Sequence, residues 1–380
     1  MPSRTDGGGR AGRPARVTSA EALARVPGSI PGRCVMSFAS IGNWCVRTSG
    51  GMPTLSSARA LVALAGSTLA TTAALAGPVP DYGHDFVVIG DPGNRAVNQD
   101  EGPRFYPPYA PEGFSVGRVD YRYRMARTDA PYYDGPTNWS EFTSTWIVFD
   151  HGTGQYRALD GTENYAANMG WRYAARYCNW LQNGQSLDQG AFESGAYDTS
   201  TFGQNPDGSF TDQLNHNADA LFWIPTLDEW TKAMHWDPAK NDAEGGYWRY
   251  PNSSDTASVP GPPGIGETNA GTNKNVDTGS YPGVMSPWGL LDGSGGEMEW
   301  LEDAELNSHI RYLRGSSTIL PPDYFDAIDW VGGGPPWQAT GGLRLAASVP
   351  TPAPGAVLGL TGTYLSLRRR TACRRMEDVN

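Results

Sequence analysis

The sequence predicts an α+β domain rich in irregular loop, and three observations support this expectation. Residues 116–128 alternate apolar and polar side chains, which is the period of a strand with one buried face, whereas residues 166–182 place apolar and aromatic side chains at helical spacing. Gly and Pro make up about a fifth of the chain, which favours loops but is less than disordered chains contain. The 13 Trp, 18 Tyr and 11 Phe are enough to build a sizeable core between those loops.

Turn and capping signals add shorter elements. The β-branched run at 85–91 ends in an Asp-Pro-Gly sequence, which predicts a strand followed by a turn. Thr226 and Glu229 have the spacing of a capping box, so we expect a helix to begin directly after Thr226 and Glu229 to have a structural role. Residues 312–317 and 341–346 predict two further short strands.

A glycine-rich segment follows a long irregular stretch. Residues 237–288 have little periodicity, and such stretches inside a domain are usually functional or stabilised by ligands such as metals. Residues 289–300 then read GLLDGSGGEMEW, with Asp292, Glu297 and Glu299 strung on glycines that let backbone carbonyls turn inward. Carboxylates and carbonyls together are the ligands that Ca²⁺ prefers. Taken alone, the segment fits either a Ca²⁺ site or a surface turn of solvated acids.

Charge is distributed unevenly along the chain. Residues 1–51 carry seven Arg against two acids and residues 349–380 carry five Arg against two acids, although the whole chain has a formal net charge of −11. The middle of the chain is therefore strongly acidic. Because an acidic body repels nucleic acid and anionic lipid, we expect neither as a partner.

The stretch that begins at Met52 has the anatomy of a secretory signal peptide. Arg59 precedes an apolar run, and a small-residue cleavage site completes a signal peptide over residues 52–76. The alternative is a buried helix, but the run consists of small residues and has no polar face. The prediction makes the export machinery a partner, and it makes residues 1–51 an upstream artefact or a disordered segment.

The C-terminal stretch, residues 349–375, contains a Pro-rich turn, a modest apolar run and an arginine cluster. This order resembles the PEP-CTERM sorting signal of Gram-negative bacteria, which implies cleavage by a membrane exosortase. Thr351 stands where that signal usually has a glutamate, and the alternative is a disordered basic tail. Together the two ends predict an exported protein that is placed at the cell surface, in the outer envelope, or secreted.

Five short motifs occur in order through the body, residues 77–348: WRYAARYCNWL, IPTLDEW, GLLDGSGGEMEW, YLRGSS and GLRLA. Their order resembles that of the formylglycine-generating enzyme family, also called the sulfatase-modifying factor domain. Each motif is weak by itself, but the ordered set is specific. The resemblance implies a single domain with an α+β fold related to C-type lectins and much irregular loop.

The resemblance also implies Ca²⁺ as a structural cofactor. In the family a side chain binds the ion at the position of Asp292, and a carboxylate binds it at the position of Glu299. Backbone carbonyls at the positions of Gly295 and Glu297 supply the other two ligands. A second family Ca²⁺ site corresponds to the neighbourhood of Asn269 and Ala270. Gly296 and Glu297 replace the usual Asn and small apolar residue, so the loop departs from the family pattern there.

Catalytic members of the family bind copper through two cysteines between the fourth and fifth motifs. Here that interval, residues 315–342, contains no cysteine, and Cu(I) requires soft thiolate ligands. Copper and formylglycine generation are therefore not expected. Another branch uses iron held by histidines, but the five His of this chain are scattered without ligand spacing. Cys178, in the first predicted helix, has no His or Lys near it in the sequence and is expected to be a packing residue.

The interval 315–342 instead offers aromatic side chains beside carboxylates. Tyr324, Asp326 and Trp330 are the expected ligand-binding residues, since aromatic faces and carboxylates suit a glycan or a peptide. The alternative is a loop packed over the former active-site cleft. The leading hypothesis is a Ca²⁺-stabilised binding or structural module without oxidase chemistry, a pseudoenzyme of the family. The remaining hypotheses are an active formylglycine-generating oxidoreductase and a lectin-like carbohydrate-binding module.

Overall fold

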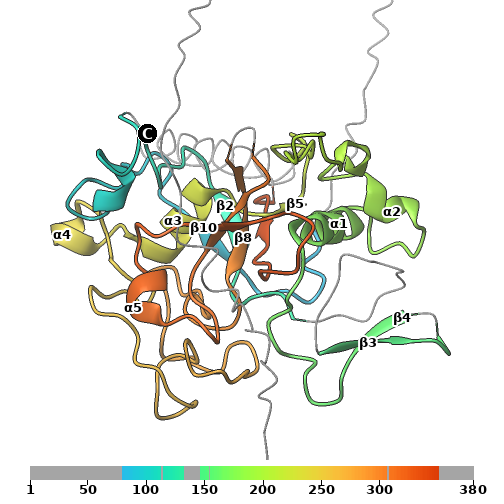
Figure 1. Ribbon diagram of the computed structural model, residues 1–380. Helices are drawn as coiled ribbons and strands as arrows, with labels where there is room; N and C mark the ends of the chain where they lie inside the picture. The colour runs from blue at the N-terminus through green and yellow to red at the C-terminus, as the bar shows by residue number, and fades with distance from the viewer. Residues whose placement is uncertain (1–78, 113, 132–145, 154, 306–307, 351–380) are drawn as a thin grey trace, which may run out of the picture. The chain divides into compact units, whose positions relative to one another are not determined.

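The computed structural model describes residues 79–112, 114–131, 146–153, 155–305 and 308–350, and all of them belong to one compact unit (Figure 1). The expected signal peptide, the segment before it and nearly all of the expected sorting tail lie outside these residues. Among the described residues, no helix has both the length and the apolarity needed to cross a membrane.

A four-stranded antiparallel sheet lies at the centre of the unit, where Figure 1 labels β2 and β5. In this sheet β2 lies between β1 and β11. In order across the sheet, the strands are β1 (Phe86–Ile89), β2 (Tyr123–Ala126), β11 (Ala346–Ala347) and β5 (Phe222–Trp223). Every residue of β2 is buried. Met125 of β2 is the Cα partner of Ala346, which also pairs with Trp223, so the C-terminal strand closes the sheet between β2 and β5.

A second antiparallel sheet has the order β10-β9-β8, and two ribbons complete the β structure. The strands of this sheet are β8 (Glu299–Ala304), β9 (Arg311–Arg314) and β10 (Gly332–Gly334). The ribbons are β3 (Ile147–Asp150) with β4 (Gln155–Ala158), and β6 (Trp236–Asp237) with β7 (Gly246–Tyr247). The β8–β9 pairing is irregular between Trp300 and Ala304.

Two helices of substantial length pack against these sheets. They are α1 (Trp171–Gln182) and α3 (Leu227–His235), and the shorter helical pieces are η2 (Pro103–Phe105), α2 (Gly190–Glu193), η3 (Thr199–Thr201), α4 (Lys240–Ala243) and α5 (Pro322–Phe325). The predicted capping box is confirmed. Thr226 Oγ1 accepts a hydrogen bond from Glu229 N at 3.1 Å, and Glu229 Oε2 accepts one from Thr226 N at 2.8 Å.

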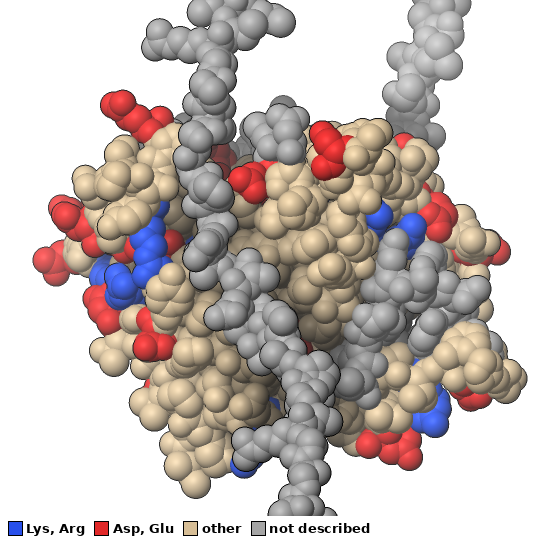
Figure 2. Space-filling model, in the orientation of Figure 1, with Lys and Arg blue, Asp and Glu red and all other residues tan. Residues whose placement is uncertain are grey.

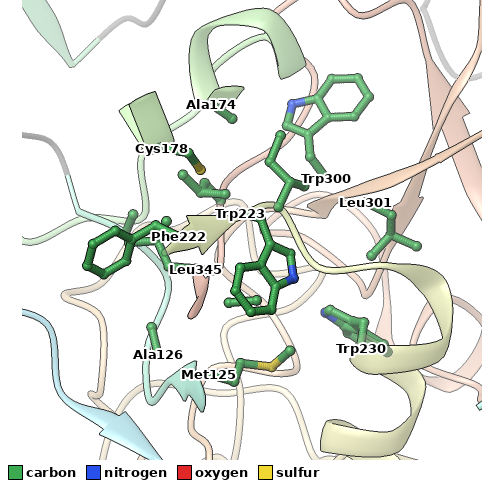
Figure 3. Close-up of a cluster of buried hydrophobic side chains, with 14 of the residues drawn as sticks. Met125, Ala126, Ala174, Cys178, Phe222, Trp223, Trp230, Trp300, Leu301 and Leu345 are labelled. Carbon is green, nitrogen blue, oxygen red and sulfur yellow. The ribbon is translucent and has the colours of Figure 1, made fainter. Parts of the chain in front are cut away.

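One hydrophobic core joins the helices to both sheets (Figure 3). Cys178 on α1, Trp230 on α3 and Trp300 on β8 are fully buried within it. Burial also raises the pKa of the Cys178 thiol well above its ordinary value. Cys178 is therefore a core residue, as its position in the sequence predicted.

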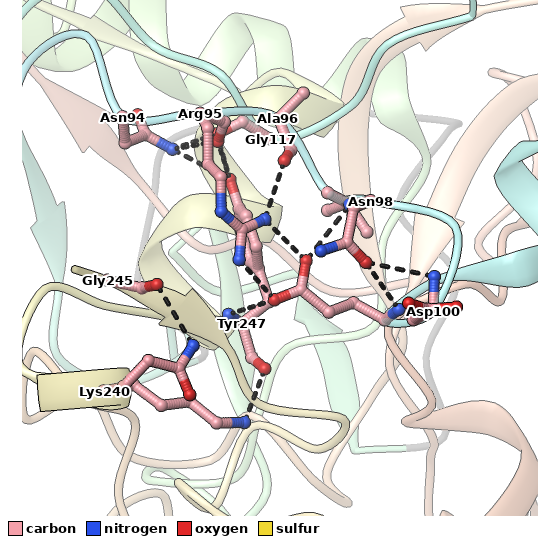
Figure 4. A network of polar contacts seen from close by, with 12 residues as sticks. Asn94, Arg95, Ala96, Asn98, Asp100, Gly117, Lys240, Gly245 and Tyr247 are labelled. Carbon is pink, nitrogen blue, oxygen red and sulfur yellow. Dashed lines mark hydrogen bonds and ion pairs between the residues drawn. The ribbon is translucent and has the colours of Figure 1, made fainter.

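A separate polar network fastens the loop after β1 to β7 (Figure 4). Arg95 donates hydrogen bonds to both carboxylate oxygens of Glu101, each at 2.6 Å. Glu101 also accepts from Tyr247 N at 3.0 Å, and Tyr247 Oη donates to the carbonyl of Arg95 at 2.9 Å. The network thereby holds the loop after β1 against β7.

The structure confirms the predicted α+β class: helices are few, the sheets are small and antiparallel, and much of the chain is irregular. The strand predicted over 116–128 is much shorter than expected. Gly117 has a φ of 89°, which interrupts extended backbone, and its N–H donates to Asp228 on α3 at 2.7 Å instead of to a strand. The strand predicted at 341–346 is also reduced, to Ala346–Ala347.

The capping box allows a direct test of how α3 is stabilised. We expect Thr226→Ala to lower the free energy of unfolding by about 1 kcal/mol, because the N–H of Glu229 loses its acceptor at the helix start. Urea unfolding measures the change. Thr226→Ser, which keeps the acceptor, and Thr256→Ala at an exposed loop position are the controls. Equal losses in all three variants would contradict the capping role.

Candidate metal centre

The glycine-rich segment adopts the inward-turning backbone that its sequence predicted. Asp292, Gly295 and Gly296 have φ values of 55°, 90° and 60°. A Cβ atom at Gly295 would lie 2.1 Å from Asn269 Oδ1, so only glycine fits this position. Gly295 N donates to Ser316 Oγ and Gly296 N donates to Asn269 Oδ1, each at 2.9 Å. The fold thus brings Asn269 directly against the segment.

A buried arginine lies beneath this segment. Arg344 is fully buried, and its Nη2 lies 2.7 Å from Glu299 Oε1 and 2.8 Å from Asp129 Oδ1. The same guanidinium donates to the carbonyls of Ala126, Arg127 and Leu291. Glu299 further accepts from Trp230 Nε1 at 2.5 Å. Arg344 therefore ties the end of β2, the glycine segment and the start of β8 to one point.

The negative charge around Arg344 exceeds the positive charge. Asp129 and Glu299 pair with the Arg344 guanidinium, and the half-buried Asp292 carboxyl lies near enough to interact with its charge, so three carboxyl groups share one positive charge. Burial raises the pKa of Asp292 to about 6, and burial together with the charge of Glu299 raises the pKa of Asp129 well above its ordinary value. Asp129 Oδ2 has no hydrogen-bond partner among the described residues. Full ionisation of this cluster requires a further positive charge, either protons or a bound cation.

Two small cavities flank the glycine segment, and each has room for a single water-sized particle. The polar side chains lining the first belong to Asn252, Glu267, Tyr281, Asp292 and Ser294. The polar side chains lining the second belong to Tyr165, Asn269, Asn275 and Glu297. Both linings supply oxygen atoms and no sulfur, which suits a hard cation.

Glu297 lies on the second cavity with its side chain turned to the protein. Its Oε2 accepts a hydrogen bond from Asn168 Nδ2 at 2.8 Å. Burial raises the pKa of Glu297 to about 7, although the bond from Asn168 acts in the opposite direction. A carboxylate therefore stands at a position where the family resemblance implied only a backbone carbonyl ligand.

The arrangement limits which groups can hold a metal. Within the part of the chain that the structure describes, no three His, Cys, Asp or Glu side chains are grouped as metal ligands. Both oxygens of Glu299 are already engaged by Arg344 and Trp230. Asp292 lines the first cavity with both of its oxygens accepting from Gly279 N, at 3.0 and 2.7 Å, and Asn269 lines the second. A cation at either cavity would also need backbone carbonyls and water, and such oxygen ligands fit Ca²⁺ and not copper.

Of the three expected ligand-binding residues, Asp326 is buried, whereas Tyr324 and Trp330 both pack their rings on Phe325. Asp326 is 2 % exposed, its Oδ1 accepts from Ser316 N at 2.5 Å, and burial raises its pKa to about 7. It therefore lies under the glycine segment. Tyr324 is half exposed with the Arg104 guanidinium 4.6 Å from its ring centroid, while Trp330 packs on Phe325. None of the three lines either cavity beside the glycine segment.

Asp129 and Arg344 were not expected at this site from the sequence. Arg344 lies in the GLRLA motif, which was used only to recognise the family order. Asp129 is 215 residues away from Arg344, and no local pattern marks it. A charged residue inside an otherwise apolar strand motif is the signal that could have pointed to Arg344.

Acidic side chains are spread over the visible surface as well. Figure 2 shows carboxylates in several groups towards the edge of this face, with basic side chains in small groups among them. The distribution fits the acidic body that the sequence predicted.

Comparisons with known proteins give little support for a family. No family model matches the chain, and no curated protein matches it. Among solved structures, variable protein 1 of Treponema denticola aligns with a TM-score of 0.36 and 15% identity, over 69% of this chain and 94% of that one. PvdO from Pseudomonas aeruginosa aligns with a TM-score of 0.38 and 14% identity, over 70% of this chain and 94% of that one. Similarities at this level carry no argument about fold family or function.

The role of Arg344 can be measured directly. We expect Arg344→Met to lower the free energy of unfolding by about 3–5 kcal/mol, because it leaves Asp129 and Glu299 buried without a counter-charge. Chemical unfolding gives the value. Adding Glu299→Gln to Arg344→Met should recover part of the loss, as a double-mutant cycle would reveal.

Arg157→Met is the matched control, since Arg157 forms an exposed pair with Asp160 and its loss should change stability by less than about 0.5 kcal/mol. A comparable loss in both arginine variants would contradict the account of the buried cluster.

Proposed function

We propose that this chain is a distant, non-oxidising member of the formylglycine-generating enzyme family, with the C-type-lectin-related fold, and that it serves as a Ca²⁺-stabilised binding or structural module. The ordered motifs support the family. The observation that carries the cation is the charge imbalance at Arg344, where Asp129 and Glu299 pair with one guanidinium and the nearby Asp292 carboxyl adds a third acid beside the glycine segment.

The residues present fit Ca²⁺ in kind, because they offer oxygen donors. Asp292 would supply a carboxylate on the first cavity, whereas Glu297 and Asn269 line the second, and the carbonyls of Gly295 and Glu297 would supply further oxygens. Glu299 is held by Arg344, so its carboxylate fixes the start of β8, two residues after Glu297. Ca²⁺ takes about six to eight oxygen ligands, and water would complete the set.

The absence of oxidase chemistry follows from the sequence of the interval 315–342, which contains no cysteine. Cys178 is fully buried in the core between α1 and β5, so it cannot present a thiolate to a metal and a substrate. Hard side chains such as Asp326 cannot replace two thiolates for Cu(I).

Export is the second part of the proposal. Residues 52–76 would direct secretion, and the tail at 349–375 would be cut by an exosortase, which leaves the body at the cell surface, in the outer envelope, or secreted. Mass spectrometry of the mature termini tests both: a first residue upstream of Met52 would contradict the signal peptide.

A glycan or peptide is the class of ligand that the proposal favours. The exposed ring of Tyr324, stacked with Arg104, is a surface of the kind that sugars and peptide side chains contact. A glycan array with and without chelator would distinguish a carbohydrate-binding module from a purely structural one.

The cation is tested by thermal unfolding in CaCl2 and in EDTA. We expect a higher melting temperature in CaCl2, because an ion that binds only the folded state contributes about 4 kcal/mol at a thousandfold excess over its dissociation constant. Asp292→Asn should reduce the shift, and Asp120→Asn at an exposed position should not.

Two results would contradict the proposal. Identical melting temperatures in CaCl2 and in EDTA would show that no stabilising Ca²⁺ binds. Turnover of a sulfatase-motif peptide with copper would restore the enzyme hypothesis.

A further inference from the structure

Glu302, a buried carboxylate on β8, anchors the surface segment 213–217, which is far in sequence from the glycine segment. Glu302 is 1 % exposed, and its Oε1 accepts hydrogen bonds from His216 N at 2.6 Å and from Tyr197 Oη at 2.9 Å. The His216 ring adds a third contact, with Nδ1 at 2.8 Å from the same oxygen. Glu302 Oε2 has no hydrogen-bond partner within the described parts of the chain.

The imidazole of His216 is held on two sides. It stacks on the ring of Trp223, with centroids 4.8 Å apart and planes at 17°, while Glu302 fixes its Nδ1. The side chain remains 24% exposed, so it can exchange a proton with solvent. The geometry is that of a positioned histidine–carboxylate pair at the edge of the core.

Arg311 on β9 holds the same segment through contacts that do not change near neutral pH. Its Nη2 donates to the carbonyl of Gln213 at 2.6 Å, and its Nη1 donates to the carbonyls of Leu214 and Glu302. Burial lowers the pKa of Arg311 to about 10, so it stays charged at neutral pH. Around neutral pH, the variable contact of the segment is the one made by His216.

Ionisable groups from several neighbouring elements also surround His216 and Glu302. They are Glu229 on α3, Asp303 on β8, Arg311 on β9, Cys178 on α1, and the phenols of Tyr121 and Tyr197. Burial raises the pKa of the Cys178 thiol and of both phenols, which keeps them neutral. Glu229 is bonded to Trp223 Nε1 at 3.0 Å and adds negative charge behind the histidine when ionised.

We propose that His216 and Glu302 form a pH-sensitive clasp for the segment 213–217. When His216 is protonated, its charge pairs with the buried Glu302 carboxylate and the segment stays docked on β8. When His216 loses the proton, Glu302 keeps its hydrogen bonds but has no positive partner on the segment, so the segment opens more often.

The pKa of His216 determines whether the docked segment is more stable at low or at high pH. Burial by itself lowers this pKa, but the hydrogen bond and the charge of Glu302, with a contribution from Glu229, outweigh burial and raise the pKa above its ordinary value. Such a group contributes its full stabilisation below its unfolded pKa of about 6.5 and loses it as the pH rises through the folded value.

Hydrogen exchange in the full chain tests the clasp. Between about pH 5.5 and pH 8.5, after correction for intrinsic exchange, we expect protection of the amides at 213–217 to fall at least about threefold relative to those of α1. His216→Gln should abolish this pH dependence, and His309→Gln at an exposed position should preserve it.

NMR titration of the His216 ring provides a second readout that does not require a variant. We expect an apparent pKa above about 6.5 in the native protein and a lower value in Glu302→Gln. A native value at or below about 6.5 would overturn the proposal. So would an equal loss of protection in the native protein and in His216→Gln.

Discussion

The ionic contact between Arg344 and the pair Asp129 and Glu299 is the constraint on which the rest of this structure depends. A guanidinium has five donors in a fixed plane, and Arg344 uses them on carboxylates and on carbonyls from the end of β2 and from the glycine segment. These stretches are far apart in sequence and contain little regular pairing. Removing one partner of a buried ion pair of this kind is strongly destabilising, because the other charge stays buried without compensation.

The same contact explains why the segment 289–300 can be both glycine-rich and well placed. A Cβ atom at Gly295 would collide with Asn269 and one at Gly296 would crowd Asp129, so glycine lets the backbone approach these groups closely. The result is a concentration of oxygen atoms and negative charge next to two small cavities. The oxygen donors that line these cavities are the kind that the proposed Ca²⁺ would use, and the linings contain no sulfur of the kind that copper requires.

Local patterns predicted the helical elements well and the long-range ones poorly. α1 and α3 were predictable because periodicity and the Thr226–Glu229 box act within a few residues. β2 is shorter than its alternating pattern because Gly117 turns the chain towards α3. The acids of the glycine segment were visible in the sequence, whereas Asp129 was not, because its role exists only after β2 and the C-terminal strand pair. Asp326 looked like a surface ligand residue, but its carboxylate satisfies the backbone of Ser316 inside the fold.

The central claim is that a bound cation balances the excess negative charge around Arg344. Anomalous diffraction from crystals grown in CaCl2 tests this claim most directly. The account predicts an anomalous peak at about 2.3–2.6 Å from a carboxylate oxygen of Asp292 and from carbonyl oxygens of the glycine segment. A map without such a peak, with Asp292 bonded only to protein and water, would contradict it.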